Sequence, residues 1–165
     1  MASVNGLTVK ALKTFRDHEG CEIAQGNLYL GSKKIGFWSQ DYMCGPDTFD
    51  LEREYDDDKL YQCFEQRGKN IEVAMWELLE LMETEKEFKK WKCDRMFKAT
   101  DGYHSITLGL RNATTTKEDI LGREDVQKCI EENFYKGKLD VEIYGRDSFN
   151  VGDKIALEEI RRAGV

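Results

Sequence analysis

Acidic side chains are concentrated in one short stretch of this 165-residue chain, where they could bind a basic partner. Residues 41–60 hold eight acidic and two basic residues and so carry a net charge of −6. The whole chain carries −7, so the rest of it is close to neutral. Charge concentrated in this way steers association with an oppositely charged partner and says little about the fold. This stretch is therefore the first candidate for a binding site.

The most regular part of the stretch is an alternating pattern over residues 48–55, which predicts a strand. Asp50, Glu52 and Glu54 fall on one face of that strand, with about 6.6–6.8 Å between successive side chains. This spacing is roughly twice the ~3.4 Å rise per phosphate along one DNA strand. We therefore expect a row of carboxylates that competes for the basic groove of a nucleic-acid-binding protein.

Neighbouring residues complete the expected partner-binding surface. Further carboxylates extend the row, and aromatic side chains supply the contacts that dominate the binding energy of many interfaces. The full set is Asp41, Asp47, Asp50, Glu52, Glu54, Asp56, Trp38 and Tyr55. A structural interpretation stays open as well, because outward-facing carboxylates also keep the edge of a sheet soluble.

Metal binding is another interpretation of the same acidic stretch. Carboxylate oxygens are the ligands that Mg²⁺ and Ca²⁺ prefer, and residues 56–58 offer three in a row. The run does not fit an EF-hand calcium loop, since Tyr61 and Arg67 stand where that loop needs Gly and Glu. We therefore predict no metal site and expect Asp57 or Asp58 to cap a helix instead.

Neither histidine indicates a catalytic site. His18 lies in a predicted turn among acidic residues, and His104 shares a predicted strand face with Ile106 and Leu108. The chain has no glycine-rich phosphate loop and no serine-hydrolase motif. We therefore expect a non-enzymatic protein with no catalytic residues and no cofactor. The alternative is an enzyme of nucleotide or nucleic-acid metabolism that uses His104.

Cysteine usage and composition indicate a soluble cytoplasmic protein. The five cysteines are irregularly spaced without a C-x-x-C pair, and Cys63, Cys93 and Cys129 fall on apolar faces of predicted helices. This pattern favours reduced thiols. No stretch resembles a membrane span or a secretion signal. A sequence pI near 5.0 disfavours direct nucleic-acid binding.

Periodicity along the chain predicts an α+β fold in which helices cover one face of a mainly antiparallel sheet. A β-meander is expected in the first 55 residues, with its last strand at 48–55. The later elements are expected as helices at 57–68 and 71–98, a strand at 103–110, a helix at 117–135, a strand at 139–144 and a helix at 153–163. We expect one domain, residues 1–165, that is β-rich over 1–55, helical over 57–98 and mixed over 103–165.

Part of the meander resembles a pattern in small uncharacterised proteins of phages and other mobile elements. The pattern comprises Leu12–Arg16, Glu19-Gly20, Asn27–Leu30 and Lys33–Gly36, and it contains no catalytic motif. The resemblance implies a setting in which small acidic proteins often inhibit host defence systems, as anti-CRISPR proteins do. We therefore hypothesise an inhibitor that binds a host protein or ribonucleoprotein with a basic surface. A structural or assembly protein of a virion is a further alternative.

Overall fold

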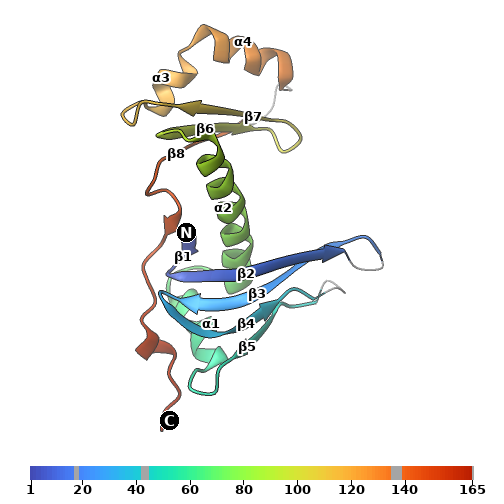
Figure 1. Ribbon diagram of the computed structural model, residues 1–165, viewed down its shortest axis with the longest axis vertical. Coiled ribbons are helices and arrows are strands. Elements are labelled where there is room, and N and C mark those ends of the chain that lie inside the picture. The colour runs from blue at the N-terminus through green and yellow to red at the C-terminus, as the bar shows by residue number, and fades with distance from the viewer. Residues whose placement is uncertain (17–18, 42–44, 135–138, 165) are drawn as a thin grey trace. The chain divides into compact units, whose positions relative to one another are not determined.

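The computed structural model describes residues 1–16, 19–41, 45–134 and 139–164. The chain divides into two compact units, each with its own sheet (Figure 1). Unit 1 is formed by Met1–Met82 together with Asn150–Val165, and unit 2 by Glu83–Phe149. The expected single domain over residues 1–165 stays a prediction.

Unit 1 is built on a six-stranded sheet that begins as the predicted β-meander. Consecutive strands from β1 to β5 pair antiparallel, and β1 also pairs parallel with β9 from the C-terminal part of the chain. The order across the sheet is β5-β4-β3-β2-β1-β9, so β5 is an edge strand. The strands are β1 (Ser3–Val4), β2 (Leu7–Arg16), β3 (Glu22–Leu30), β4 (Lys33–Ser39), β5 (Thr48–Leu51) and β9 (Asn150–Val151).

Two helices lie on the same side of this sheet, behind it in the view of Figure 1. They are α1 (Asp57–Gln66) and the part of α2 (Ile71–Trp91) that belongs to unit 1. Their buried residues recur every three or four positions, which confirms the predicted apolar faces. These residues are Leu60, Cys63, Phe64, Ile71, Ala74, Met75, Leu78 and Leu81.

The sheet of unit 1 contributes its own fully buried aromatic residue, Trp38 on β4. The register places Trp38 beside Gly26 on β3 and beside Phe49 on β5. Gly36, on the same strand, allows β5 to approach closely, because a Cβ there would lie 2.3 Å from the carbonyl oxygen of Asp50. Close packing of β4 against β5 therefore requires glycine at this position.

The C-terminal segment of unit 1 is held by hydrogen bonds to residues far away in the sequence. Arg67 donates to the Asp153 carbonyl (3.2 Å) and to the Glu159 carboxylate (3.1 Å). Arg162 donates to the Tyr55 carbonyl (2.7 Å). The predicted helix over 153–163 is therefore wrong. The segment forms only the short 3-10 helix η1 (Leu157–Ile160), because its backbone pairs with distant chain instead.

Unit 2 contains a three-stranded antiparallel sheet with the order β7-β6-β8. Two helices pack on one face of it around Phe97, Ala99, Ile120 and Val126. Figure 1 shows these helices and the sheet together in the upper part of the view. The elements are β6 (Arg95–Thr100), β7 (Ser105–Leu110), α3 (Lys117–Leu121), α4 (Glu124–Asn133) and β8 (Asp140–Tyr144).

Two predicted helices have different boundaries in the structure. The helix expected over 71–98 ends at Trp91, because Lys92 has a φ of 49° and the chain then enters strand β6. The helix expected over 117–135 is two helices, since Gly122 ends α3 and Arg123 has an extended backbone. Apolar residues stand on both sides of each break, so their periodicity alone did not reveal where the helices end.

The α+β class and the mainly antiparallel pairing are both confirmed. Within the part of the chain that the structure describes, none of the helices combines the length and apolar character needed to cross a membrane.

Candidate partner-binding surface

The expected row of carboxylates begins on the edge strand β5 but does not continue along it. Asp50 is exposed and pairs across the sheet with Phe37. The strand ends at Leu51, and the chain then turns, with the Tyr55 amide donating to the Glu52 carbonyl (2.8 Å). The evenly spaced row of Asp50, Glu52 and Glu54 is therefore wrong. Asp50 fits the alternative role of keeping an exposed sheet edge soluble.

Two other expected contact residues have partners within unit 1. Glu54 forms an ion pair with Lys33 (3.3 Å), and hydrogen bonds from Tyr55 and Lys33 lower the pKa of Glu54. Asp56 is the N-cap of α1, since its side chain accepts a hydrogen bond from the Lys59 amide (3.3 Å). Both side chains thus stabilise the fold, and both also add negative charge to unit 1.

The two aromatic residues expected at the surface lie in the core. Trp38 is fully buried, and its indole Nε1 donates to Asp47 Oδ2 (2.8 Å). Tyr55 is also buried, and burial raises its pKa to about 12. Neither side chain is therefore exposed at the surface in this structure, and the expectation that they contact a partner stays a prediction. Both were chosen because they are aromatic and near the acidic row in sequence, and neither property shows which face of the sheet is buried.

Asp47 lies at the junction between the sheet and α2. Burial, followed by the nearby Glu72 carboxylate, raises its pKa, and the hydrogen bond from Trp38 opposes that rise. The Asp47 amide also donates to Glu72 Oε1 (3.2 Å). Glu72 is distant in sequence from the acidic stretch, so sequence reasoning missed it.

The charges of four carboxylates act on Tyr61, and we call Asp47, Asp57, Asp58 and Glu72 the Tyr61 cluster. Burial raises the pKa of Tyr61, and each of the four carboxylates raises it further. Tyr61 itself is oriented by an edge-to-face contact with Phe49, with 5.6 Å between ring centroids. Asp57 and Asp58 are exposed in the first turn of α1, where negative charge also favours the helix dipole. The structure thus shows no linear row of carboxylates, but four carboxylates whose charges all act on Tyr61.

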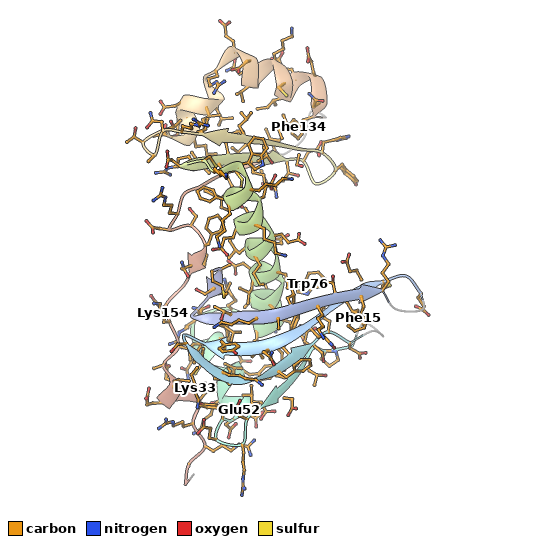
Figure 2. All side chains as sticks on the ribbon, in the orientation of Figure 1. Phe15, Lys33, Glu52, Trp76, Phe134 and Lys154 are labelled. Carbon is orange, nitrogen blue, oxygen red and sulfur yellow. The ribbon has the colours of Figure 1, made fainter. Side chains whose placement is uncertain are left out.

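The exposed face of α2 carries two large apolar side chains that the sequence prediction did not include. Val73 is 59% exposed and Trp76 is 61% exposed. Figure 2 shows Trp76 on the part of α2 that belongs to unit 1. A signal was present in the sequence, since neither residue fits the buried pattern of Ile71, Ala74, Met75 and Leu78.

Some expected residues lie at or beyond the limits of the described chain. Asp41 is half-buried and directly precedes residues 42–44, which lie outside the described residues. His18 also lies outside them. The buried thiols are confirmed for Cys63 and Cys93.

His104 is positioned by a turn and not by a strand. Asp101 Oδ1 accepts hydrogen bonds from the backbone amides of Tyr103 (2.9 Å) and His104 (2.7 Å). The imidazole Nδ1 lies 3.5 Å from Asp101 Oδ2. Because β7 begins only at Ser105, the expected half-buried strand position of His104 is wrong, and its side chain is largely exposed.

The described residues include no candidate metal site, since among them no three His, Cys, Asp or Glu side chains are arranged to hold an ion.

Comparison of the chain with protein-family models, with curated proteins and with solved structures finds no match. The geometry of unit 1 therefore carries the functional argument.

Proposed function

We propose that this protein is a phage-encoded, non-enzymatic inhibitor that binds a nucleic-acid-handling host defence complex, in the manner of anti-CRISPR proteins. Its acidic surface would occupy a groove that the host protein uses for nucleic acid, without binding nucleic acid itself. The observation that carries this proposal is the placement of the exposed Asp57 and Asp58 in the first turn of α1, together with the hydrogen bond that joins Asp47 to Glu72. These four carboxylates form the Tyr61 cluster, and each raises the pKa of Tyr61.

Like charges held close together oppose folding, so their grouping needs a compensating role. Two members of the Tyr61 cluster have structural roles, since Asp47 accepts from Trp38 and Glu72 accepts from the Asp47 amide. Asp57 and Asp58 remain exposed at the start of α1. A basic partner would remove the repulsion and release its own counterions, which favours fast and salt-sensitive association.

The test removes three charges from the cluster and compares the result with an equal removal elsewhere. The variant D57N/D58N/E72Q keeps the shape and hydrogen-bonding oxygen of each side chain. The matched control E118Q/E124Q/E131Q neutralises three exposed carboxylates of unit 2. Tagged wild-type protein and both variants are used to capture partners from a host lysate at increasing salt.

We expect the wild type and the control to capture the same nucleic-acid-binding protein and to release it early as salt rises. The cluster variant should lose that capture while remaining folded, which its cooperative melting transition verifies. The captured protein should also lose its nucleic acid when the inhibitor is added in excess. Equal capture by the wild type and the cluster variant would overturn the assignment of the surface.

An enzyme that uses His104 is the second candidate, because Asp101 lies 3.5 Å from the imidazole and could orient it. The variant H104A and the wild type are assayed on a panel of phosphodiesters and nucleotides. A turnover that disappears in H104A would favour this enzyme over the inhibitor.

A further inference from the structure

We propose that Val73 and Trp76 on α2 are the apolar anchor of the interface, and that they insert into an apolar pocket rimmed by lysine and arginine on the partner. This inference rests on the proposed function and specifies the chemistry of the partner surface. We call Val73, Trp76 and the flanking Glu72 and Glu80 the α2 anchor face.

The anchor residues are among the most exposed large apolar side chains of unit 1. Val73 is 59% exposed and Trp76 is 61% exposed, and they lie three residues apart on one helix. Side chains at this separation are neighbours on a helix surface. Exposed apolar side chains grouped in this way mark interaction sites, and tryptophan is enriched among the residues that dominate binding energy.

The core of unit 1 does not account for these two side chains. The buried face of α2 is formed by Ile71, Ala74, Met75 and Leu78, which point to the other side of the helix. Val73 and Trp76 therefore add little to the folding of unit 1 in this structure. Their apolar surface would be removed from water only when another molecule covers it.

The charges around the anchor select the kind of partner. Glu72 and Glu80 lie on the same face of α2 as Trp76, at one turn to either side. Glu77, beside them, forms an ion pair with Lys69. A second copy of this chain would bring a like-charged face into contact, whereas a lysine- and arginine-rimmed pocket would pair with it.

The anchor face is also continuous with the Tyr61 cluster, because Glu72 belongs to both. Its carboxylate accepts the Asp47 amide at 3.2 Å, which links the start of α2 to the acidic stretch. The two surfaces affect different steps of binding. The carboxylates set the rate of association and its salt dependence, and Trp76 sets the rate of dissociation.

A defined probe tests this difference: a fluorescently labelled, amphipathic helical peptide made of leucine and lysine. Its binding to the full-length wild type, W76A, D57N/D58N/E72Q and W91A is measured at several salt concentrations. W91A is the matched control, because Trp91 lies on the same helix and is 48% exposed. Melting temperatures verify that each variant is folded.

We expect W76A to weaken binding at least tenfold by faster dissociation, with an unchanged salt dependence. The cluster variant should bind more slowly and with a weaker salt dependence, and W91A should match the wild type. Wild-type affinity in W76A, or no binding of the peptide to the wild type, would overturn the anchor. A self-associated wild type that becomes monomeric in W76A would assign the face to a second copy and overturn it too.

The outcomes also separate this inference from the proposed function. If W76A binds like the wild type while the cluster variant loses salt-dependent capture of the host protein, the anchor fails and the proposed function stands. If the cluster variant captures the host protein normally, the proposed acidic surface fails whatever W76A does.

Discussion

The two units of the molecule both contain many charged residues but differ sharply in net charge. Unit 1 holds 18 acidic and 12 basic residues, a net charge of −6, whereas unit 2 holds 14 and 13, a net charge of −1. In unit 2, exposed ion pairs such as Arg123 with Asp125 balance local charge. Charge imbalance in this protein is thus a property of one unit, and the same unit carries the exposed Trp76.

The units also differ in how far apart in sequence their contacts reach. Unit 1 combines the first 82 residues with the C-terminal segment, so hydrogen bonds such as Arg67 to Glu159 connect distant parts of the chain. Unit 2 is one continuous stretch whose ion pairs include close neighbours in sequence. We therefore expect substitutions with similar chemistry to cost more stability in unit 1 than in unit 2.

The largest effect is expected at the buried tryptophan of unit 1. Trp38→Ala removes a fully buried ring and leaves Asp47 without its indole donor. The free energy of unfolding should fall by about 3–5 kcal/mol. In unit 2, Trp91→Ala removes a half-exposed ring and should cost much less. Chemical denaturation measures both, and equal losses would remove the expected contrast between the units.

Glycines that allow close packing give the next contrast. Gly36→Ala places a methyl group against the backbone of Asp50 and Leu51, so β4 and β5 must separate, at a cost of about 2–3 kcal/mol. Gly109→Ala meets the ring of Trp91 at 2.8 Å and the Cβ of Cys93 at 3.4 Å. The Cys93 contact has an ordinary van der Waals length, and the half-exposed ring of Trp91 can move. The cost of Gly109→Ala should stay below about 1 kcal/mol. Thermal denaturation of both variants measures the two losses in stability. A larger loss for Gly36→Ala would support close packing of edge strand β5 against β4.

Regular patterns in the sequence predicted the parts of the fold that depend on local periodicity. The β-meander and the apolar faces of both helices of unit 1 are confirmed, because a buried face repeats every two residues in strands and every three or four in helices. The end of α2 at Trp91 was not predictable in this way. Residues such as Met96 and Phe97 suit a helix face as well as a strand, and the unusual backbone of Lys92 has no signature in its residue type.

The candidate site was predictable in charge but not in geometry. The excess of acidic residues is visible in composition, whereas the Tyr61 cluster depends on Glu72 folding back against Asp47. Burial of Trp38 and Tyr55 also depends on which face of the sheet the helices cover, and alternation alone does not specify that choice. Trp76 was detectable, since it falls outside the apolar face of α2.

A smaller difference in stability is expected between two arginine substitutions, one in each unit. Arg67→Ala removes hydrogen bonds that hold the C-terminal segment to α1, and we expect a loss of about 2 kcal/mol. Arg123→Ala removes an exposed pair with Asp125 in unit 2, and solvent screening leaves such a pair with little effect on stability. Hydrogen exchange near the C-terminus should speed up only in the Arg67 variant. Unchanged exchange there would contradict the role given to Arg67.

Two substitutions of Asp56, the N-cap of α1, distinguish the structural role of its side chain from the role of its charge. Asp56→Ala removes the side-chain acceptor for the Lys59 amide and should cost about 1 kcal/mol. Asp56→Asn keeps an acceptor and should be close to neutral in stability. If Asp56→Asn nevertheless weakens capture of the host protein, the charge contributes to binding. If both variants are equally unstable, Asp56 stabilises α1 through its charge and not as a cap.

The smallest effects are titrations of single carboxyls, and they should have opposite signs in the two units. Burial raises the pKa of Asp47, so its contribution to stability is present at low pH and is lost as pH rises through its folded-state pKa. The Thr116 amide, which donates to Asp119 in unit 2, lowers the pKa of Asp119. Its contribution is present above the unfolded-state pKa and is lost as pH falls through the folded-state value.

Carbon-detected NMR of the side-chain carboxyls measures both midpoints in one sample. The Asp47 midpoint should lie above the usual range for aspartate, and the Asp119 midpoint below it. Asp47→Asn, which keeps an oxygen for the Trp38 indole, should remove the decline in stability that accompanies ionisation of Asp47. An Asp47 midpoint below that of Asp119 would mean that the hydrogen bond from Trp38 outweighs burial. The fold itself would then stabilise the ionised Asp47 carboxylate through the Trp38 indole. No basic partner would be needed to offset the charge of Asp47 within the Tyr61 cluster.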